Sequence, residues 1–231
     1  MIAGTVSCEI RDHVATVELR NPTVCNALTR PVREQLLAAL ERIDGRDDVH
    51  VVVLQGAGGN FTSGLYLQDM YAVPDATFAQ FAEILAIIPA LRQPVIAAID
   101  GYCLGGGAQL AFTCDLRIAG ASARIGIPAG KARVHYPEVL FGVLVDSIGR
   151  AAANYLLLTG EALDADAALS MGLVQRRCPE GTAPGALAQD LARRIAAQDP
   201  DYTAVHKARL TATGSVHPVR PVDQQKGPIQ P

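Results

Sequence analysis

The sequence predicts an α/β fold, in which buried strands alternate with helices around one core. Three observations predict it: short β-branched runs typical of buried strands, glycine-rich loops that follow two of these runs, and helical stretches after the loops. The chain has 231 residues, of which 49% are hydrophobic. This length fits one domain with a sizeable core.

The N-terminal part predicts two strands, a helix and a third strand. Residues 5–10 and 14–19 alternate in the manner of strands. Apolar residues then recur at helical spacing after Thr29, the expected N-cap, as far as Gly45, which ends the helix. The β-branched run 49–54 is typical of a buried strand.

Two glycine-rich loops follow apolar strands in the middle of the chain. The first loop covers residues 56–64, and the second covers residues 100–107 after a strand at 94–99. A helix is expected between the loops at 78–91, and a further helix and strand are expected within 108–119. The repeated order of strand, glycine loop and helix makes the two loops the expected functional end of the fold.

The C-terminal part predicts helices and then a change of character. Residues 150–172 are rich in alanine and leucine and helical in pattern, with a break expected at Thr159-Gly160. Two more helices are expected at 183–198 and 202–213. Residues 215–231 carry several prolines and few apolar side chains, which indicates a tail or an arm.

Composition excludes several functional classes. A formal net charge of −3 argues against a dedicated nucleic-acid binder. No apolar run reaches the length that a membrane span needs, and the charged residues Glu9, Arg11 and Asp12 argue against a signal peptide. The five cysteines form no Cys-x-x-Cys pair, which predicts reduced thiols, no metal site and a cytoplasmic location.

The glycine loops allow more than one interpretation. They could bind phosphate, but no Gly-Lys-Ser/Thr follows either loop and Gly-x-Gly-x-x-Gly is absent. They could simply allow close packing at a turn. They could also present backbone N–H groups, one from each loop, to a single carbonyl oxygen as an oxyanion hole.

Several ordered stretches carry a resemblance to a known family. Residues 21–28 read Asn-Pro-Thr-Val-Cys-Asn-Ala-Leu, and residues 61–65 read Phe-Thr-Ser-Gly-Leu. Further matches are the long stretch 94–119, with its triplet Gly105-Gly106-Gly107, and the later segments 158–160, 165–168 and 172–174. Together they resemble the crotonase (enoyl-CoA hydratase/isomerase) superfamily, and the resemblance spans residue 5 to about residue 213.

The resemblance implies a fold, a substrate class and an assembly. It implies a crotonase-like ββα spiral core at 1–180, a C-terminal helical region at 181–214, and a tail or oligomerisation arm at 215–231. The implied substrate is an acyl thioester, usually acyl-CoA, with coenzyme A as part of the substrate and no permanently bound cofactor. Because the C-terminus departs from the family pattern, a carrier-protein thioester stays open. The implied assembly is a homo-oligomer, either a trimer or a hexamer.

The resemblance also assigns site residues. The backbone N–H groups of Leu65 and Gly106 would form the oxyanion hole. The residues implied to bind substrate are Val24, Ala27, Thr62, Ser63, Leu67, Tyr102, Gly105, Gln109 and Pro128.

Two positions depart from the hydratases of this family, which use two glutamates to position and activate water. Gln109 stands at the position of the first glutamate and Ala129 at that of the second. An amide can hold a water molecule but cannot take up a proton near neutral pH, and alanine can do neither. Ordinary hydration by this pair is therefore not expected.

Three residues on a nearby turn are candidates for the missing proton chemistry, placed there by the resemblance. His135 could shuttle a proton or lie on the surface. Tyr136, the first choice, could donate to an enolate carbon, hold a carboxylate, or only pack beside Pro137. Glu138 could act as a base if partly buried, or remain a solvated carboxylate.

Two functions from different classes follow. The favoured one is an enzyme that stabilises a thioester enolate, which fits an isomerase, a decarboxylase or a non-standard hydratase. The alternative is a non-catalytic acyl-thioester-binding protein that kept the hole and lost the chemistry. RNA binding is disfavoured because Glu34 and Glu41 balance the arginines of the helix that follows Thr29.

Overall fold

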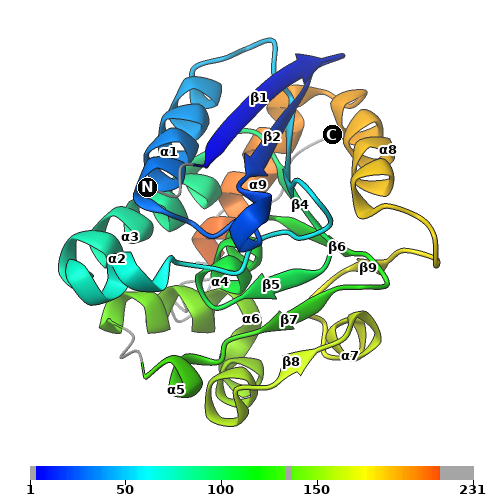
Figure 1. Cartoon of the computed structure of the whole chain (residues 1–231). Helices are drawn as coiled ribbons and strands as arrows, with labels where there is room; N and C mark the ends of the chain where they lie inside the picture. Colours follow the sequence, from blue (N-terminus) through cyan, green and yellow to red (C-terminus); the bar gives the residue numbers. More distant parts are fainter. Residues whose placement is uncertain (1–3, 134–136, 214–231) are drawn as a thin grey trace, which may run out of the picture.

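The computed structural model describes residues 4–133 and 137–213, and it confirms the α/β fold (Figure 1). Its larger sheet has six strands in the order β1-β2-β3-β4-β6-β9. Strands β1 and β2 pair antiparallel, and every other neighbouring pair in this sheet is parallel. The strands are β1 (Thr5–Arg11), β2 (Val14–Arg20), β3 (Val51–Gly56), β4 (Val95–Ile99), β6 (Leu116–Ala119) and β9 (Arg176–Arg177).

Both faces of the central strands of this sheet are buried, whereas β1 at its edge is largely exposed. Side chains alternate across a strand, so Val52 and Leu54 of β3 pack into the main core while Val51 and Val53 pack into a second cluster. Helices α1 (Arg30–Asp44) and α3 (Pro74–Ala90) cover the first face, and α8 (Pro184–Ala196) covers the second (Figure 1). The sequence reads as continuous apolar runs at β3 and β4 for this reason.

A smaller sheet and a group of helices lie beside the large sheet. The small sheet has the order β5-β7-β8, with a parallel pair and an antiparallel pair. The remaining elements are η1 (Pro22–Val24), α2 (Leu67–Ala72), β5 (Tyr102–Leu104), α4 (Gly106–Thr113), β7 (Arg124–Gly126), α5 (Ala129–Ala132), α6 (Glu138–Thr159), β8 (Ala162–Leu163), α7 (Ala165–Ser170) and α9 (Pro200–Thr213).

Helix α9 is anchored to the core by one buried cation. The Lys207 ammonium donates to the carbonyl oxygens of Ile88 and Gln93, each at 2.9 Å, and pairs with Asp115 at 2.8 Å. Asp115 also accepts the backbone N–H of Val95 at the start of β4. The C-terminal helix is therefore joined to α3 and to the middle of the sheet.

The structure differs from the sequence expectations at several boundaries. Helix α6 begins at Glu138 rather than at residue 150, and Gly149, with φ 76° and ψ 156°, interrupts the helical geometry inside it. The expected break at Gly160 is confirmed, with a left-handed C-cap there. Thr29 precedes α1 as expected, but its side chain makes no capping hydrogen bond. Short elements such as β5 and α2 lie inside segments that read as loops.

Helix α6 is apolar over much of its exposed side as well as its buried side. Leu140, Leu144 and Leu156 are buried in the core. Val139 and Leu158 are exposed, and Leu158 is 84% exposed. Within the described part of the chain, α6 alone has the length and composition that could cross a membrane, in contrast to the sequence expectation. Its buried leucines make it a packed helix of this fold.

The expected division of the chain at residue 180 stays a prediction, and residues 215–231 lie outside the described residues.

All five cysteines are free, and Cys103, Cys114 and Cys178 are buried.

Candidate active site

The two glycine loops are joined side by side. They leave the same edge of the sheet because β3 and β4 are parallel neighbours. Phe61 donates its N–H to the Asp100 carbonyl at 2.7 Å, Thr62 donates to Tyr102 at 2.9 Å, and Leu104 donates back to Thr62 at 3.1 Å. This short parallel pairing brings residues 64–65 of the first loop against residues 104–107 of the second.

Glycine is required where the loops meet. Gly64 has a φ of +95°, and a Cβ atom there would clash with the carbonyl oxygen of Leu104 and lie 3.0 Å from the Gly106 nitrogen. A Cβ atom on Gly106 would lie 3.3 Å from the Leu65 nitrogen. The backbones of Leu65 and Gly106 are therefore adjacent, and a side chain at Gly64 would not fit beside them.

The Leu65 N–H is directed by its neighbours. The carbonyl of Gly64 accepts the Leu28 N–H at 2.8 Å, and the peptide bond between Gly64 and Leu65 is trans. The Leu65 N–H therefore points away from Leu28. Among the described residues it has no hydrogen-bond acceptor.

The Gly106 N–H is directed in the same way. Gly105 is the N-cap of α4, and its carbonyl accepts the Gln109 N–H at 3.1 Å inside the helix. The Gly106 N–H points outward from the first turn of α4, at the positive end of the helix dipole. It too has no acceptor within the part of the chain that the structure describes.

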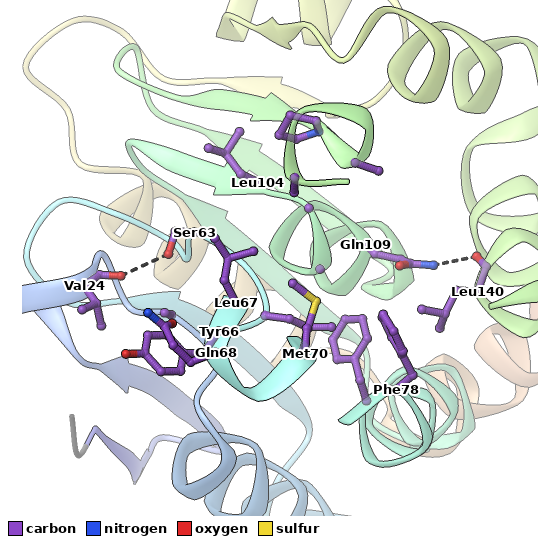
Figure 2. A pocket seen from close by; sticks show the side chains of 18 residues that line it. Val24, Ser63, Tyr66, Leu67, Gln68, Met70, Phe78, Leu104, Gln109 and Leu140 are labelled. Atoms are coloured by element: carbon purple, nitrogen blue, oxygen red, sulfur yellow. Dashed lines mark hydrogen bonds between the residues drawn. The ribbon is translucent and has the colours of Figure 1, made fainter. Parts of the chain in front are cut away.

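Leu65 and Gly106, the residues that carry these two N–H groups, both line a cavity of about 350 Å³. Figure 2 shows the side chains around it. Its walls are mostly apolar, and they come from the two glycine loops, α2, α3, α4, α5 and α6. The lining residues are Val24, Ala27, Ser63, Leu65, Tyr66, Leu67, Gln68, Met70, Phe78, Phe81, Leu104, Gly105, Gly106, Gln109, Pro128, Ala129, Ala132 and Leu140.

Gln109 is an oriented polar group in the apolar part of this cavity. It is fully buried, and its Nε2 donates to the Leu140 carbonyl at 2.6 Å (Figure 2). A carbonyl oxygen can only accept a hydrogen bond, so the amide nitrogen must face Leu140 and the oxygen Oε1 must face away from it. No described residue donates to Oε1. The Oε1 atom is itself buried, so Gln109 lines the cavity without exposing this acceptor to it.

Most of the residues expected to bind substrate, and both residues expected to form the oxyanion hole, line this one cavity. They are Val24, Ala27, Ser63, Leu65, Leu67, Gly105, Gly106, Gln109 and Pro128. Thr62, Tyr102 and Glu138 are not among its lining residues. Tyr102 is 47% exposed, and Glu138 is the exposed first residue of α6. His135 and Tyr136 lie outside the described residues, so the catalytic roles of these groups stay predictions.

Nine lining residues were not among the expected site residues. They are Tyr66, Gln68, Met70, Phe78, Phe81, Leu104, Ala129, Ala132 and Leu140. Phe78 and Phe81 carry the one usable signal, because they recur on one face of the helix expected at 78–91. Helix α2, which supplies Leu67, Gln68 and Met70, gives no pattern of its own in six residues.

Asn26 explains part of the motif at residues 21–28. Its Nδ2 donates to the carbonyl oxygens of Ala57 and Asn60, each at 2.7 Å, and its Oδ1 accepts the Asn21 N–H at 2.8 Å. This side chain holds the first glycine loop in place without lining the cavity.

Thr62 has a positioning role in the same loop. Its hydroxyl donates to the Asn26 carbonyl at 2.7 Å and accepts the Gly64 N–H at 3.0 Å. Because Thr62→Val removes both bonds at a fully buried position, we expect a loss of about 1–3 kcal/mol in the free energy of unfolding. Denaturant unfolding measures this, and Thr62→Ser, which keeps the hydroxyl, is the control. Equal stability of the Val variant and wild type would contradict it.

A family model of known proteins matches most of the chain. The family model described as "Enoyl-CoA hydratase/isomerase" matches residues 9–226. The chain belongs to the enoyl-CoA hydratase/isomerase family.

Two named relatives are about one third identical to the chain over the aligned residues. A "Probable enoyl-CoA hydratase echA8" of Mycobacterium bovis is 33% identical over 190 residues, which is 78% of this chain and 70% of the relative. An "(E)-benzylidenesuccinyl-CoA hydratase" of Thauera aromatica is 36% identical over 204 residues, covering 84% and 77%.

Solved structures of the enoyl-CoA hydratase/isomerase family share the fold. The crystal structure of an "enoyl-CoA hydratase/ carnithine racemase" from Magnetospirillum magneticum has a TM-score of 0.88 and 32% identity, covering 94% of this chain and 84% of that one. The expected crotonase fold is thereby confirmed.

Proposed function

We propose that the protein acts on an acyl thioester, in the first place an acyl-CoA, and stabilises its enolate through the N–H groups of Leu65 and Gly106. The supporting observation is that two residues whose backbone N–H groups have no acceptor among the described residues line one apolar cavity. Each donor in an oxyanion hole contributes about 3–4 kcal/mol to the transition state. The two named relatives are both hydratases of CoA thioesters by name.

The proposed reaction is an isomerisation, a decarboxylation or a non-standard hydration. Gln109 and Ala129 line the cavity where the resemblance places two glutamates, and neither can move a proton at neutral pH. We assign the proton transfer to the turn at residues 135–138, with Tyr136 first, then His135 and Glu138.

We further propose a cytoplasmic homo-oligomer, either a trimer or a hexamer, with no permanently bound cofactor. The exposed apolar side chains of α6 and α9, such as Leu158 and Tyr202, support a contact with a second copy. Coenzyme A enters and leaves as part of the substrate, and a carrier-protein thioester is the other substrate form.

A panel of thioesters in deuterated water tests the function. Saturated, 2-enoyl, 3-enoyl, dienoyl and malonyl-type CoA thioesters are each incubated with the protein and analysed by mass spectrometry. We expect one class to show an enzyme-dependent change, either water addition, loss of carbon dioxide, or deuterium exchange at the α-carbon. Silence across the panel would contradict catalysis.

One observation favours a second candidate, a non-catalytic acyl-thioester-binding protein. Tyr66 is the single ionisable side chain among the described residues that line the cavity. For this candidate, thioesters bind without turnover, and Tyr136→Phe leaves the binding unchanged.

A further inference from the structure

Arg33 is a buried cation in the interior behind the cavity. Its side chain is 2% exposed, and it comes from α1, which contributes no lining residue. Its Nη1 donates to the Leu28 carbonyl at 2.7 Å and to Asp69 Oδ2 at 2.9 Å, and its Nε donates to Gln80 Oε1 at 2.9 Å. One guanidinium thus joins α1 to α2, to α3 and to the backbone at Leu28.

The Leu28 contact leads directly to the first N–H donor. Leu28 donates its own N–H to Gly64, and its carbonyl accepts the Tyr66 N–H at 3.4 Å. Leu28 therefore holds the residues on either side of Leu65 and sets the direction of the Leu65 N–H. The Tyr66 bond is long, so the shorter, charge-assisted bond from Arg33 is the stronger restraint on the Leu28 carbonyl.

The Asp69 contact leads to the cavity wall. Asp69 lies in α2, whose Leu67, Gln68 and Met70 line the cavity. Its Oδ2 accepts the Arg30 N–H at 2.8 Å as well as the Arg33 bond. Helix α2 is only six residues long, and this carboxylate joins it to the N-terminal turn of α1.

The charge of Arg33 is costly where it lies. Burial lowers the pKa of the guanidinium, and the hydrogen bond from Arg33 to Asp69 opposes that shift. An apolar residue could fill the site without that desolvation. What an apolar residue cannot do is hold three acceptors from three directions in one rigid plane.

We propose that Arg33 is a positioning residue for the thioester site. Through Leu28 it holds the Leu65 N–H aimed at the thioester oxygen, and through Asp69 it holds α2 as the cavity wall. This inference rests on the proposed function, because the donor must act on a thioester carbonyl.

Isotope-edited infrared spectroscopy tests the proposal. The probe is butyryl-CoA with ¹³C at the thioester carbonyl, whose stretching frequency falls when N–H groups polarise the bound carbonyl. The variants are Arg33→Met, which removes every bond, and Asp69→Asn, which leaves the Leu28 bond. Arg30→Met is the matched control, because Arg30 is an exposed arginine on the same helix, and among the described residues its side chain bonds Glu34 alone.

We expect wild type and Arg30→Met to show the same downward shift. Arg33→Met should lose most of the shift. It should also lower kcat for the thioester class that the protein turns over by roughly 10- to 100-fold, since small misplacements of a catalytic group have effects of that size. Asp69→Asn should keep the shift but bind butyryl-CoA several-fold more weakly. Arg33→Lys keeps the charge without the planar fork, and it should lose part of the shift even if the methionine variant does not fold.

The outcomes separate this inference from the proposed function. A full shift in Arg33→Met or Arg33→Lys, with a shift in wild type, overturns the role of Arg33 and leaves the proposed function intact. No shift in wild type with bound butyryl-CoA overturns the oxyanion assignment, and the positioning role with it.

Discussion

Gly106→Pro is expected to lower thioester turnover about 10²- to 10³-fold, the usual effect of removing one donor from an oxyanion hole. The Gly106 N–H lies at the first position of α4 and has no acceptor among the described residues. Proline fits the first position of a helix, where its fixed φ is favourable and its missing N–H breaks no helical bond. The variant should therefore fold while it lacks the donor.

Gly106→Ala is the matched control for this change. It keeps the N–H and adds a Cβ atom 3.0 Å from Leu65 Cγ and 3.2 Å from Phe81 Cζ. Steady-state kinetics on the active thioester class should rank wild type first, the alanine variant second and the proline variant last. Equal losses in both variants would mean that crowding is the cause, and full turnover by the proline variant would show that Gly106 is not a donor.

The double substitution Gln109→Glu and Ala129→Glu is expected to raise hydration of a 2-enoyl-CoA by about 10²- to 10⁴-fold, the range of general acid–base catalysis. Both positions line the same cavity as the two N–H donors. One new carboxyl group would replace the Gln109 amide next to the Leu140 carbonyl, and the other would lie at the start of α5. Burial raises the pKa of such carboxyl groups toward the working pH.

The loss of the ultraviolet absorbance of the enoyl thioester measures this gain. Each single variant is a control, because one carboxyl group cannot both activate and position the water. A double variant that folds, binds the enoyl-CoA and hydrates it no faster than wild type would show that these two positions do not determine the reaction.

The elements with apolar periodicity were predictable from the sequence, and the short ones were not. Strands β3 and β4 are continuous buried apolar runs, and helix α3 buries residues at helical spacing. Strand β5 has three residues, and it forms because it pairs with β7 and, through a single bridge at Cys103, with Thr62 of the first glycine loop. Such a strand depends on a partner far away in the sequence, which no local pattern shows.

The candidate site was likewise predictable from the sequence only in part. The glycines and the motif around Asn26 identify the two loops, because backbone geometry restricts the residue type there. Thr62 was expected to bind substrate, but its hydroxyl is used by Asn26 and Gly64. In the sequence, Arg33 is indistinguishable from an ordinary exposed helix charge beside Glu34. Its partners Asp69 and Gln80 come from distant segments and are seen only in the structure.

The anchoring of Lys207 bears on how this chain folds. Its two carbonyl partners lie 119 and 114 positions earlier in the sequence. Contacts between segments so distant form only after a large loop has closed, and a high proportion of them is associated with slow folding. The first half of the chain therefore reaches its final packing only when a helix from the far end docks on it. Loss of that helix would remove the partner of Asp115, which holds the start of β4, the strand that leads into the second glycine loop.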